Sequence, residues 1–146
     1  MAVFRKITES DIEKVAALEN AYFTDAWTAK SIYETSCQSQ AFIVVAEEEN
    51  EIAGYCIVYH VMDEGEIARI AVADTYRRKG IGCELLDTVC EIGKEFGLAR
   101  LLLEVRESNE GARGFYRAYG FAEDGLRKNF YEMPKEHAVL MSKQIG

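Results

Sequence analysis

The stretch YRRKGIGCELL, from Tyr76 to Leu86, joins a hydrophobic run to a leucine-rich one through three consecutive basic residues and two glycines. The run before it, EIARIAVAD (Glu66 to Asp74), predicts a β-strand. From Ile81 onward, apolar residues recur every three or four positions, which predicts a helix that Gly97 can end. The segment therefore has the order strand, basic glycine turn, helix.

This order predicts an anion site, because backbone N–H groups of the turn and the positive end of the helix converge on one point. A Walker-type nucleotide loop is disfavoured, since Lys79 precedes both glycines and no Ser or Thr follows. A dinucleotide fingerprint needs a third glycine, but position 85 is Leu. The diphosphate of coenzyme A, held without a metal, fits the remaining chemistry. The alternative is a surface turn with solvated basic residues.

Composition limits the class of protein. The chain has 146 residues, of which 49% are apolar and 29% charged, so we expect one globular domain over residues 1–146. The formal net charge of -8 disfavours nucleic acid and anionic membranes as partners and would attract a cationic substrate. Arg5, Lys6 and Thr8 precede any long apolar run, so we expect no secretory signal, no membrane span and a cytoplasmic location. The spacing of the four cysteines predicts no metal site.

The N-terminal half predicts a strand, a helix and a hairpin. Val3–Ile7 alternates apolar and polar residues, as a half-buried strand does. Thr8 and Asp11 have the spacing of a capping box for the helix that follows. Ala41–Glu47 and Ile52–Val61 are rich in β-branched and aromatic residues, so they predict the two strands of a hairpin.

The C-terminal half predicts further strands and one helix. Ala99–Arg106 is a continuous apolar run, which is typical of a buried strand. The segment SNEGARGFYRAYG predicts a helix with Ser108 or Asn109 as its N-cap and Gly120 as its stop. Two more strands are expected around Pro134. Together these elements indicate an α+β (α/β-like) fold with a single sheet of mixed strand direction.

At this level of detail the sequence resembles a known family. RRKGIG is similar to the acyl-coenzyme A loop of the GNAT superfamily of N-acetyltransferases, whose pattern is R/Q-x-x-G-x-G/A, and IAV is similar to the strand before that loop. LEVRESN, FYRAYGF and RKNFYE resemble, in order and spacing, the bacterial ribosomal-protein alanine N-acetyltransferases. The resemblance runs from about Phe4 to Lys143. It implies the GNAT acyl-CoA N-acyltransferase fold, a single mixed, mostly antiparallel sheet flanked by helices.

The resemblance implies acetyl-CoA as co-substrate, with no metal. A strand segment would lend its backbone to the pantetheine arm, and the loop would wrap the diphosphate with its amides. Asn109 would hydrogen-bond pantetheine, although an N-cap role alone would also explain it. The cofactor residues implied in this way are Ile70, Ala71, Val72, Arg77, Arg78, Lys79, Gly80, Ile81, Gly82, Cys83 and Asn109.

The resemblance also implies two catalytic residues. An ammonium group has no lone pair with which to attack a thioester, so acetyl transfer to an amine needs a base, and Glu104 matches that position. Tyr116 matches the donor that protonates the leaving thiolate, and its reference pKa of about 10 keeps it protonated. From the sequence pattern alone, Glu104 would be a solvated edge residue and Tyr116 a core aromatic.

For the acceptor, the resemblance implies the α-amine of a protein, namely the N-terminal alanine of a ribosomal protein. Phe130 and Tyr131 would border it, and Phe130 stands where the group often has a second Tyr. Two alternatives remain open: a GNAT enzyme for a small amine or a protein lysine, and a non-catalytic acyl-CoA-binding regulatory module.

Overall fold

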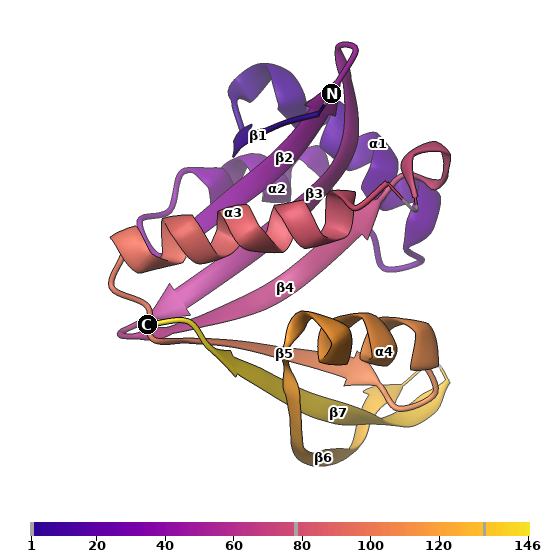
Figure 1. Ribbon diagram of the computed structural model, residues 1–146. Coiled ribbons are helices and arrows are strands. Elements are labelled where there is room, and N and C mark those ends of the chain that lie inside the picture. The colour runs from indigo at the N-terminus through magenta and orange to yellow at the C-terminus, as the bar shows by residue number, and fades with distance from the viewer. Residues whose placement is uncertain (1, 78, 133) are drawn as a thin grey trace.

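The computed structural model describes residues 2–77, 79–132 and 134–146, and one seven-stranded sheet runs through them in the order β1-β2-β3-β4-β5-β7-β6 (Figure 1). Neighbouring strands are antiparallel except β4 and β5, which are parallel. The mixed, mostly antiparallel sheet predicted from the sequence is confirmed. In chain order the elements are β1 (Val3–Lys6), a 3-10 turn (Glu9–Asp11), α1 (Ile12–Tyr22), α2 (Ala29–Ser36), β2 (Ala41–Glu48), β3 (Glu51–Val61), β4 (Glu64–Val72), a second 3-10 turn (Asp74–Tyr76), α3 (Ile81–Glu95), β5 (Arg100–Arg106), α4 (Glu110–Tyr119), β6 (Ala122–Glu132) and β7 (Lys135–Gln144).

Helices cover both faces of the sheet, with α3 on one face and α1 and α2 on the other (Figure 1). Alternate residues of β2 serve the two faces: Phe42 and Val44 belong to the core under α3, and Ile43 and Val45 to the core under α1 and α2. Tyr116 of α4 joins the first of these cores. None of the described helices has both the length and the hydrophobicity that a membrane crossing requires.

The parallel strands β4 and β5 separate soon after they begin. They pair only where Glu64–Glu66 lies beside residues 100–102, within the described chain. Beyond that point β4 keeps its pairing with β3, but the register shifts because Ala68 has no partner opposite it. An unpaired extra residue of this kind is a β-bulge, which bends its strand. The sheet therefore opens between β4 and β5.

The opening corrects one expectation from the sequence. Residues 99–106 predict a strand buried throughout, but in β5 only alternate residues are buried: Leu101, Leu103 and Val105. Leu102 and Glu104 are half-buried. The continuous apolar pattern does not mean burial on both faces here: Leu101, Leu103 and Val105 join the core under α3, but the core under α1 and α2 does not extend across the opening to any described residue of β5.

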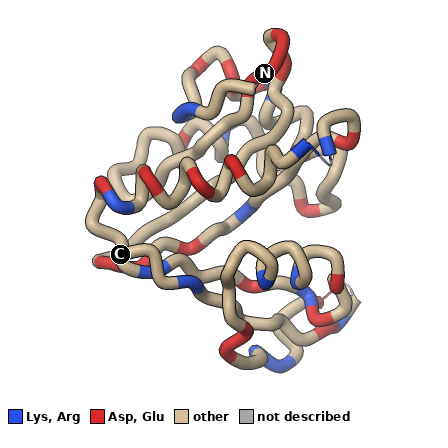
Figure 2. The backbone as a smooth tube through the Cα atoms, viewed as in Figure 1, with Lys and Arg blue, Asp and Glu red and all other residues tan. Residues whose placement is uncertain are grey.

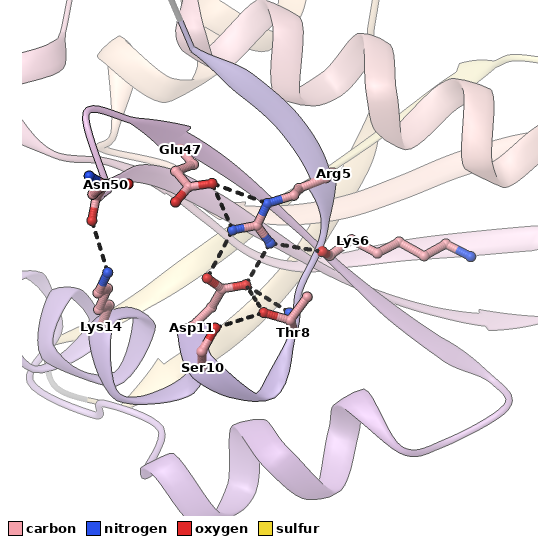
Figure 3. A network of polar contacts seen from close by, with 8 residues as sticks. All are labelled: Arg5, Lys6, Thr8, Ser10, Asp11, Lys14, Glu47 and Asn50. Atoms are coloured by element: carbon pink, nitrogen blue, oxygen red, sulfur yellow. Dashed lines mark hydrogen bonds and ion pairs between the residues drawn. The ribbon is translucent and has the colours of Figure 1, made fainter.

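A polar network fixes the N-terminal strand to the start of α1 (Figure 3). Asp11 accepts a hydrogen bond from the backbone N–H of Thr8 at 2.7 Å, which confirms the predicted capping box. The two carboxylate oxygens of Asp11 also accept hydrogen bonds from the guanidinium of Arg5, at 2.7 and 3.0 Å. Glu47 of β2 holds the same guanidinium at 3.0 Å. The side-chain hydrogen bond from Arg5 is the largest cause that lowers the pKa of Asp11, to about 2.

We expect Asp11→Asn to destabilise the protein at neutral pH, and the loss to shrink in acid. The carboxylate side chain is only 4% exposed, and a shift from 3.8 to about 2 corresponds to about 2 kcal/mol. Because the folded-state pKa is lowered, this stability is present above the unfolded pKa and disappears as the pH falls toward about 2. Urea denaturation of wild type and variant between pH 7 and pH 2 would measure it. The exposed Asp124 offers the control Asp124→Asn, and equal losses in both variants would contradict the prediction.

Candidate active site

A cleft of about 950 Å³ occupies the opening between β4 and β5. Its walls come from five parts of the chain: the segment after α1, the middle of β4, the end of β5, α4 and the end of β6. The lining residues are Tyr22, Phe23, Thr24, Asp25, Glu66, Ile67, Ala68, Arg69, Ile70, Leu103, Glu104, Val105, Arg106, Asn109, Ala112, Tyr116, Phe130, Tyr131 and Glu132.

Glu104 projects from β5 into this cleft. It lies inside the strand, opposite Leu140 of β7, as the predicted strand Ala99–Arg106 implies. Its side chain is 20% exposed, and Arg127 of β6 approaches it with Nη1 3.1 Å from Oε2. That oxygen is buried and accepts no hydrogen bond among the described residues, so the ion pair leaves its hydrogen-bonding capacity unused.

The surroundings of Glu104 raise the pKa of its carboxyl group. Burial is the largest cause, because it penalises the charged form, and the positive charge of Arg127 opposes it. The negative charge of Glu66 in β4 raises the pKa further. Glu66 pairs with Leu102, two residues before Glu104, which explains why the two carboxylates interact. A carboxylate with a raised pKa is a stronger base than a solvated one.

Tyr116 reaches the same cleft from α4. It is 7% exposed, and its ring packs at 5.2 Å from that of Phe115 and 5.5 Å from that of Phe121. Burial is the main cause that raises the pKa of its hydroxyl above the usual value. The group therefore stays protonated and able to donate at neutral pH. The core packing and the place in the cleft, which the sequence left as alternatives, coexist.

One wall of the cleft is held in place by a buried carboxylate. Glu19 of α1 is fully buried and accepts hydrogen bonds from the hydroxyl of Tyr55 at 2.7 Å, the backbone N–H of Trp27 at 2.9 Å and Nε of Arg69 at 3.0 Å. Arg69 also donates to the backbone oxygen of Asp25 at 3.0 Å. These bonds tie the segment that follows α1 to β4.

The end of β4 offers an open backbone edge. Ile70, Ala71 and Val72 pair with Cys56, Tyr55 and Gly54 of β3 on one side. On the other side, no described strand pairs with them, since β5 has already turned away. Backbone groups at such an edge can bind an extended ligand as an added strand would.

The glycine turn lies between this edge and α3. Gly80 has a φ of 77°, a left-handed conformation that favours glycine, and α3 begins at Ile81. The side chain of Ile81 is buried, so only its backbone is available there. Cys83 is exposed. Figure 2 shows basic residues at this end of α3, whereas acidic residues follow along the helix. Arg78 lies outside the described residues.

The basic side chains of this turn have neighbours within the protein. The guanidinium of Arg77 donates to the carbonyl of Val72 at 3.0 Å and pairs with Asp74 at 2.9 Å. Lys79 lies over the ring of Tyr76, at 5.4 Å from its centroid. Because the Arg77 guanidinium is already bonded within the protein, the backbone amides of the turn are more available to an anion than the Arg77 charge is.

Three further residues predicted from the sequence line the cleft. Asn109 caps α4, with Oδ1 accepting from the N–H of Ala112 at 3.1 Å, which confirms the N-cap role. Phe130 and Tyr131 of β6 also line the cleft, and their ring centroids are 5.1 Å apart.

The cleft thus brings together Ile70, Glu104, Asn109, Tyr116, Phe130 and Tyr131. Ala71, Val72, Arg77, Lys79 and Gly80 lie outside its lining, between Ile70 and α3, and Ile81–Cys83 form the start of α3. The sequence reasoning missed Glu66, Arg127 and the pair formed by Glu19 and Arg69. Arg69 carried a signal, because it is a charged residue inside an otherwise apolar strand segment. Among the described residues, no His, Cys, Asp and Glu side chains are grouped so that they could hold a metal ion.

Comparison with known proteins gives a consistent result. The family model of the Acetyltransferase (GNAT) family matches residues 12–121. The chain is 37% identical over 141 residues to a Bacillus subtilis (strain 168) protein provisionally named as a ribosomal protein bS18-alanine N-acetyltransferase, covering 96% of this chain and 93% of that one. It is 33% identical over 145 residues to the ribosomal protein bS18-alanine N-acetyltransferase of Haemophilus influenzae, covering 97% and 98%.

Solved structures agree with the sequence relatives. The ribosomal-protein-S18-alanine N-acetyltransferase from Escherichia coli superimposes with a TM-score of 0.88 at 27% identity, covering 100% of this chain and 95% of that one. Arabidopsis thaliana NAA60, solved in complex with acetyl-CoA, superimposes with a TM-score of 0.89 over 99% of both chains. At 17% identity, the second likeness shows the fold alone.

The contact between α3 and α4 predicts the effect of a side chain at Gly82. A Cβ at Gly82 would lie 3.0 Å from Cζ of Phe115, whereas Gly114 has open space at the same position. We therefore expect Gly82→Val to be less stable than Gly114→Val by about 1 to 3 kcal/mol, the usual cost of overpacking. Both variants replace a helical glycine by the same β-branched residue, so Gly114→Val controls for the substitution itself. Chemical denaturation would measure the difference, and equal stabilities would show that Phe115 yields without cost.

Proposed function

Since the chain belongs to the Acetyltransferase (GNAT) family and is an acetyl-CoA-dependent N-acetyltransferase, we propose that it acetylates the N-terminal α-amine of a protein, namely an alanine at the start of a ribosomal protein. Support comes from the relatives named for this reaction, which align over nearly the whole chain. The observation on which the mechanism rests is Glu104, a partly buried carboxylate that lines the cleft and whose buried Oε2 accepts no hydrogen bond among the described residues.

In this mechanism Glu104 accepts a proton from the ammonium group of the acceptor. The neutral amine then attacks the thioester carbon, a new C–N bond forms and the C–S bond breaks. The nitrogen loses its second proton as the amide forms, and this proton replaces the one that Tyr116 gives to the thiolate. Burial suits Glu104 to this task because it raises the pKa of the carboxyl group toward that of the amine. An α-amine, with a reference pKa of about 7.7 to 8.0, gives up its proton more readily than a lysine side chain at about 10.4.

Tyr116 is the residue proposed to return a proton to the leaving thiolate. Tyr116 lines the same cleft as Glu104, and burial keeps its hydroxyl protonated. Attack is direct, so no covalent intermediate with the enzyme is needed. The free thiols Cys37, Cys56 and Cys90 have no part in this scheme.

Acetyl-CoA supplies the activated acetyl group, and the chain offers it a continuous surface. The open edge at Ile70–Val72 would pair with the amide groups of pantetheine. Asn109 uses Oδ1 for its cap, which leaves its side-chain amide NH₂ to donate to the same arm. The amides of Gly80–Cys83 would hold the diphosphate at the start of α3, where the helix dipole favours negative charge.

We expect Glu104→Gln to keep the fold and the affinity for acetyl-CoA but to lower acetylation near pH 7 about a hundredfold, a typical contribution of a general base. The rate should recover partly at alkaline pH, because the amine then loses its proton to water. Steady-state kinetics across pH would measure the loss, and calorimetric titration with acetyl-CoA would control for cofactor binding. Wild-type turnover at every pH would exclude Glu104 as the base.

A competition assay tests the acceptor class. One mixture would contain basic peptides that begin with Ala, Ser or Leu, and one peptide with a blocked N-terminus and internal lysines. With acetyl-CoA present, we expect α-amine acetylation with the Ala peptide preferred, because Phe130 and Tyr131 narrow the cleft. Mass mapping would locate each acetyl group. Preferential acetylation of the blocked peptide would support a lysine-directed enzyme instead, and turnover of none would overturn the proposed acceptor class in favour of a small amine.

A further inference from the structure

From the contact between Arg127 and Glu104, we infer that Arg127 competes with the acceptor's ammonium group for Glu104 and must leave this carboxylate for the acceptor to bind. The inference rests on the proposed function, because it assumes that Glu104 receives the amine. The inference adds Arg127, a residue of the same chain, as a group that controls the access of the acceptor to Glu104.

The pair is a single close contact without a hydrogen bond. Nη1 of Arg127 lies 3.1 Å from Oε2 of Glu104, yet this oxygen accepts no hydrogen bond among the described residues. A directed, bidentate pairing would be the stable arrangement between a guanidinium and a carboxylate. Arg5 and Asp11 form such a pairing elsewhere in this chain, at 2.7 and 3.0 Å. Arg127 therefore balances the negative charge of Glu104 without donating a hydrogen bond to Oε2.

Arg127 is also placed where it can move. Its side chain is 56% exposed, and Glu104 is its carboxylate partner among the described residues. Its other contact is the ring of Phe130, 4.9 Å from the guanidinium carbon. The pairing of β6 with β7 shifts between Arg127 and Tyr131, so residues 128–130 bulge opposite His137. Few contacts would be lost if this side chain turned into solvent.

The charges around Glu104 favour one cation at a time. Glu66 of β4 adds a negative charge near Glu104, and Tyr131 of β6 carries a hydroxyl whose pKa is raised mainly by burial and further by Glu104. The acceptor's ammonium can replace Arg127 without a loss of charge balance. When Glu104 takes the proton from that ammonium, the carboxyl group becomes neutral and no longer attracts the guanidinium. The return of Arg127 then waits until Glu104 has lost the proton.

The experiment compares Arg127→Ala with wild type, using acetyl-CoA and a basic peptide that begins with Ala. At pH 8 we expect the KM for the peptide to fall about threefold, within the range of an exposed ion pair, while kcat is unchanged. The positive charge of Arg127 lowers the pKa of Glu104, so its removal should also shift the acid limb of the kcat/KM profile to higher pH. Arg127→Lys, which keeps a cation, should lie nearer to wild type in both measurements.

Arg117→Ala is the matched control. Arg117 pairs with Glu123 at the same distance of 3.1 Å, and its side chain is 53% exposed, but its partner Glu123, unlike Glu104, is not among the residues that line the cleft. Its removal should leave KM and the pH profile unchanged.

An unchanged or raised KM in Arg127→Ala, with an active wild type, would overturn the inference and leave the proposed function standing. A wild-type enzyme that acetylated no α-amine would overturn both.

Discussion

β4 and β5 begin side by side and separate after Glu66, at the point where Ala68 interrupts the register between β4 and β3. The cleft, the open edge of β4 and the partial burial of Glu104 all depend on this separation. If the strands stayed paired to their ends, β5 would use the edge of Ile70–Val72 for its own hydrogen bonds. The same sheet edge cannot serve both a neighbouring strand and a ligand, because each backbone group has one partner in a ladder.

The open sheet needs support on both sides of the gap. On the β4 side, Glu19 is a fully buried charge that is matched by Arg69 and by two further donors. Removing one partner of such a group leaves an uncompensated buried charge, which typically costs about 3 to 5 kcal/mol. On the β5 side, β7 pairs with β5 along residues 100–106, and α4 packs Tyr116 into the core. The cleft is thus a gap between two well-supported halves.

The distribution of charged residues fits an anionic cofactor at the start of α3 and a cationic acceptor in the cleft. The chain carries a formal net charge of -8, yet basic residues gather at the start of α3, where an anionic cofactor would be held (Figure 2). The cleft itself contains Asp25, Glu66, Glu104 and Glu132 together with Arg69 and Arg106. The acidic groups of the cleft would favour a cationic acceptor segment, and the ion pair between Arg127 and Glu104 shows that one of these carboxylates already attracts a cation of the chain.

The sequence by itself determined the local elements: the capping box of Thr8 and Asp11, the glycine turn at Gly80 and the Asn109 cap each need only neighbouring residues. It also indicated the family, since the motifs are contiguous. The sequence pattern did not predict that one face of β5 borders a cleft, that Gly82 lies against Phe115, or that Glu104 meets Arg127. Those features were decided by the tertiary structure. They join residues that are distant along the chain, and hydrophobic periodicity carries no information about which strand, in which register, will lie opposite another.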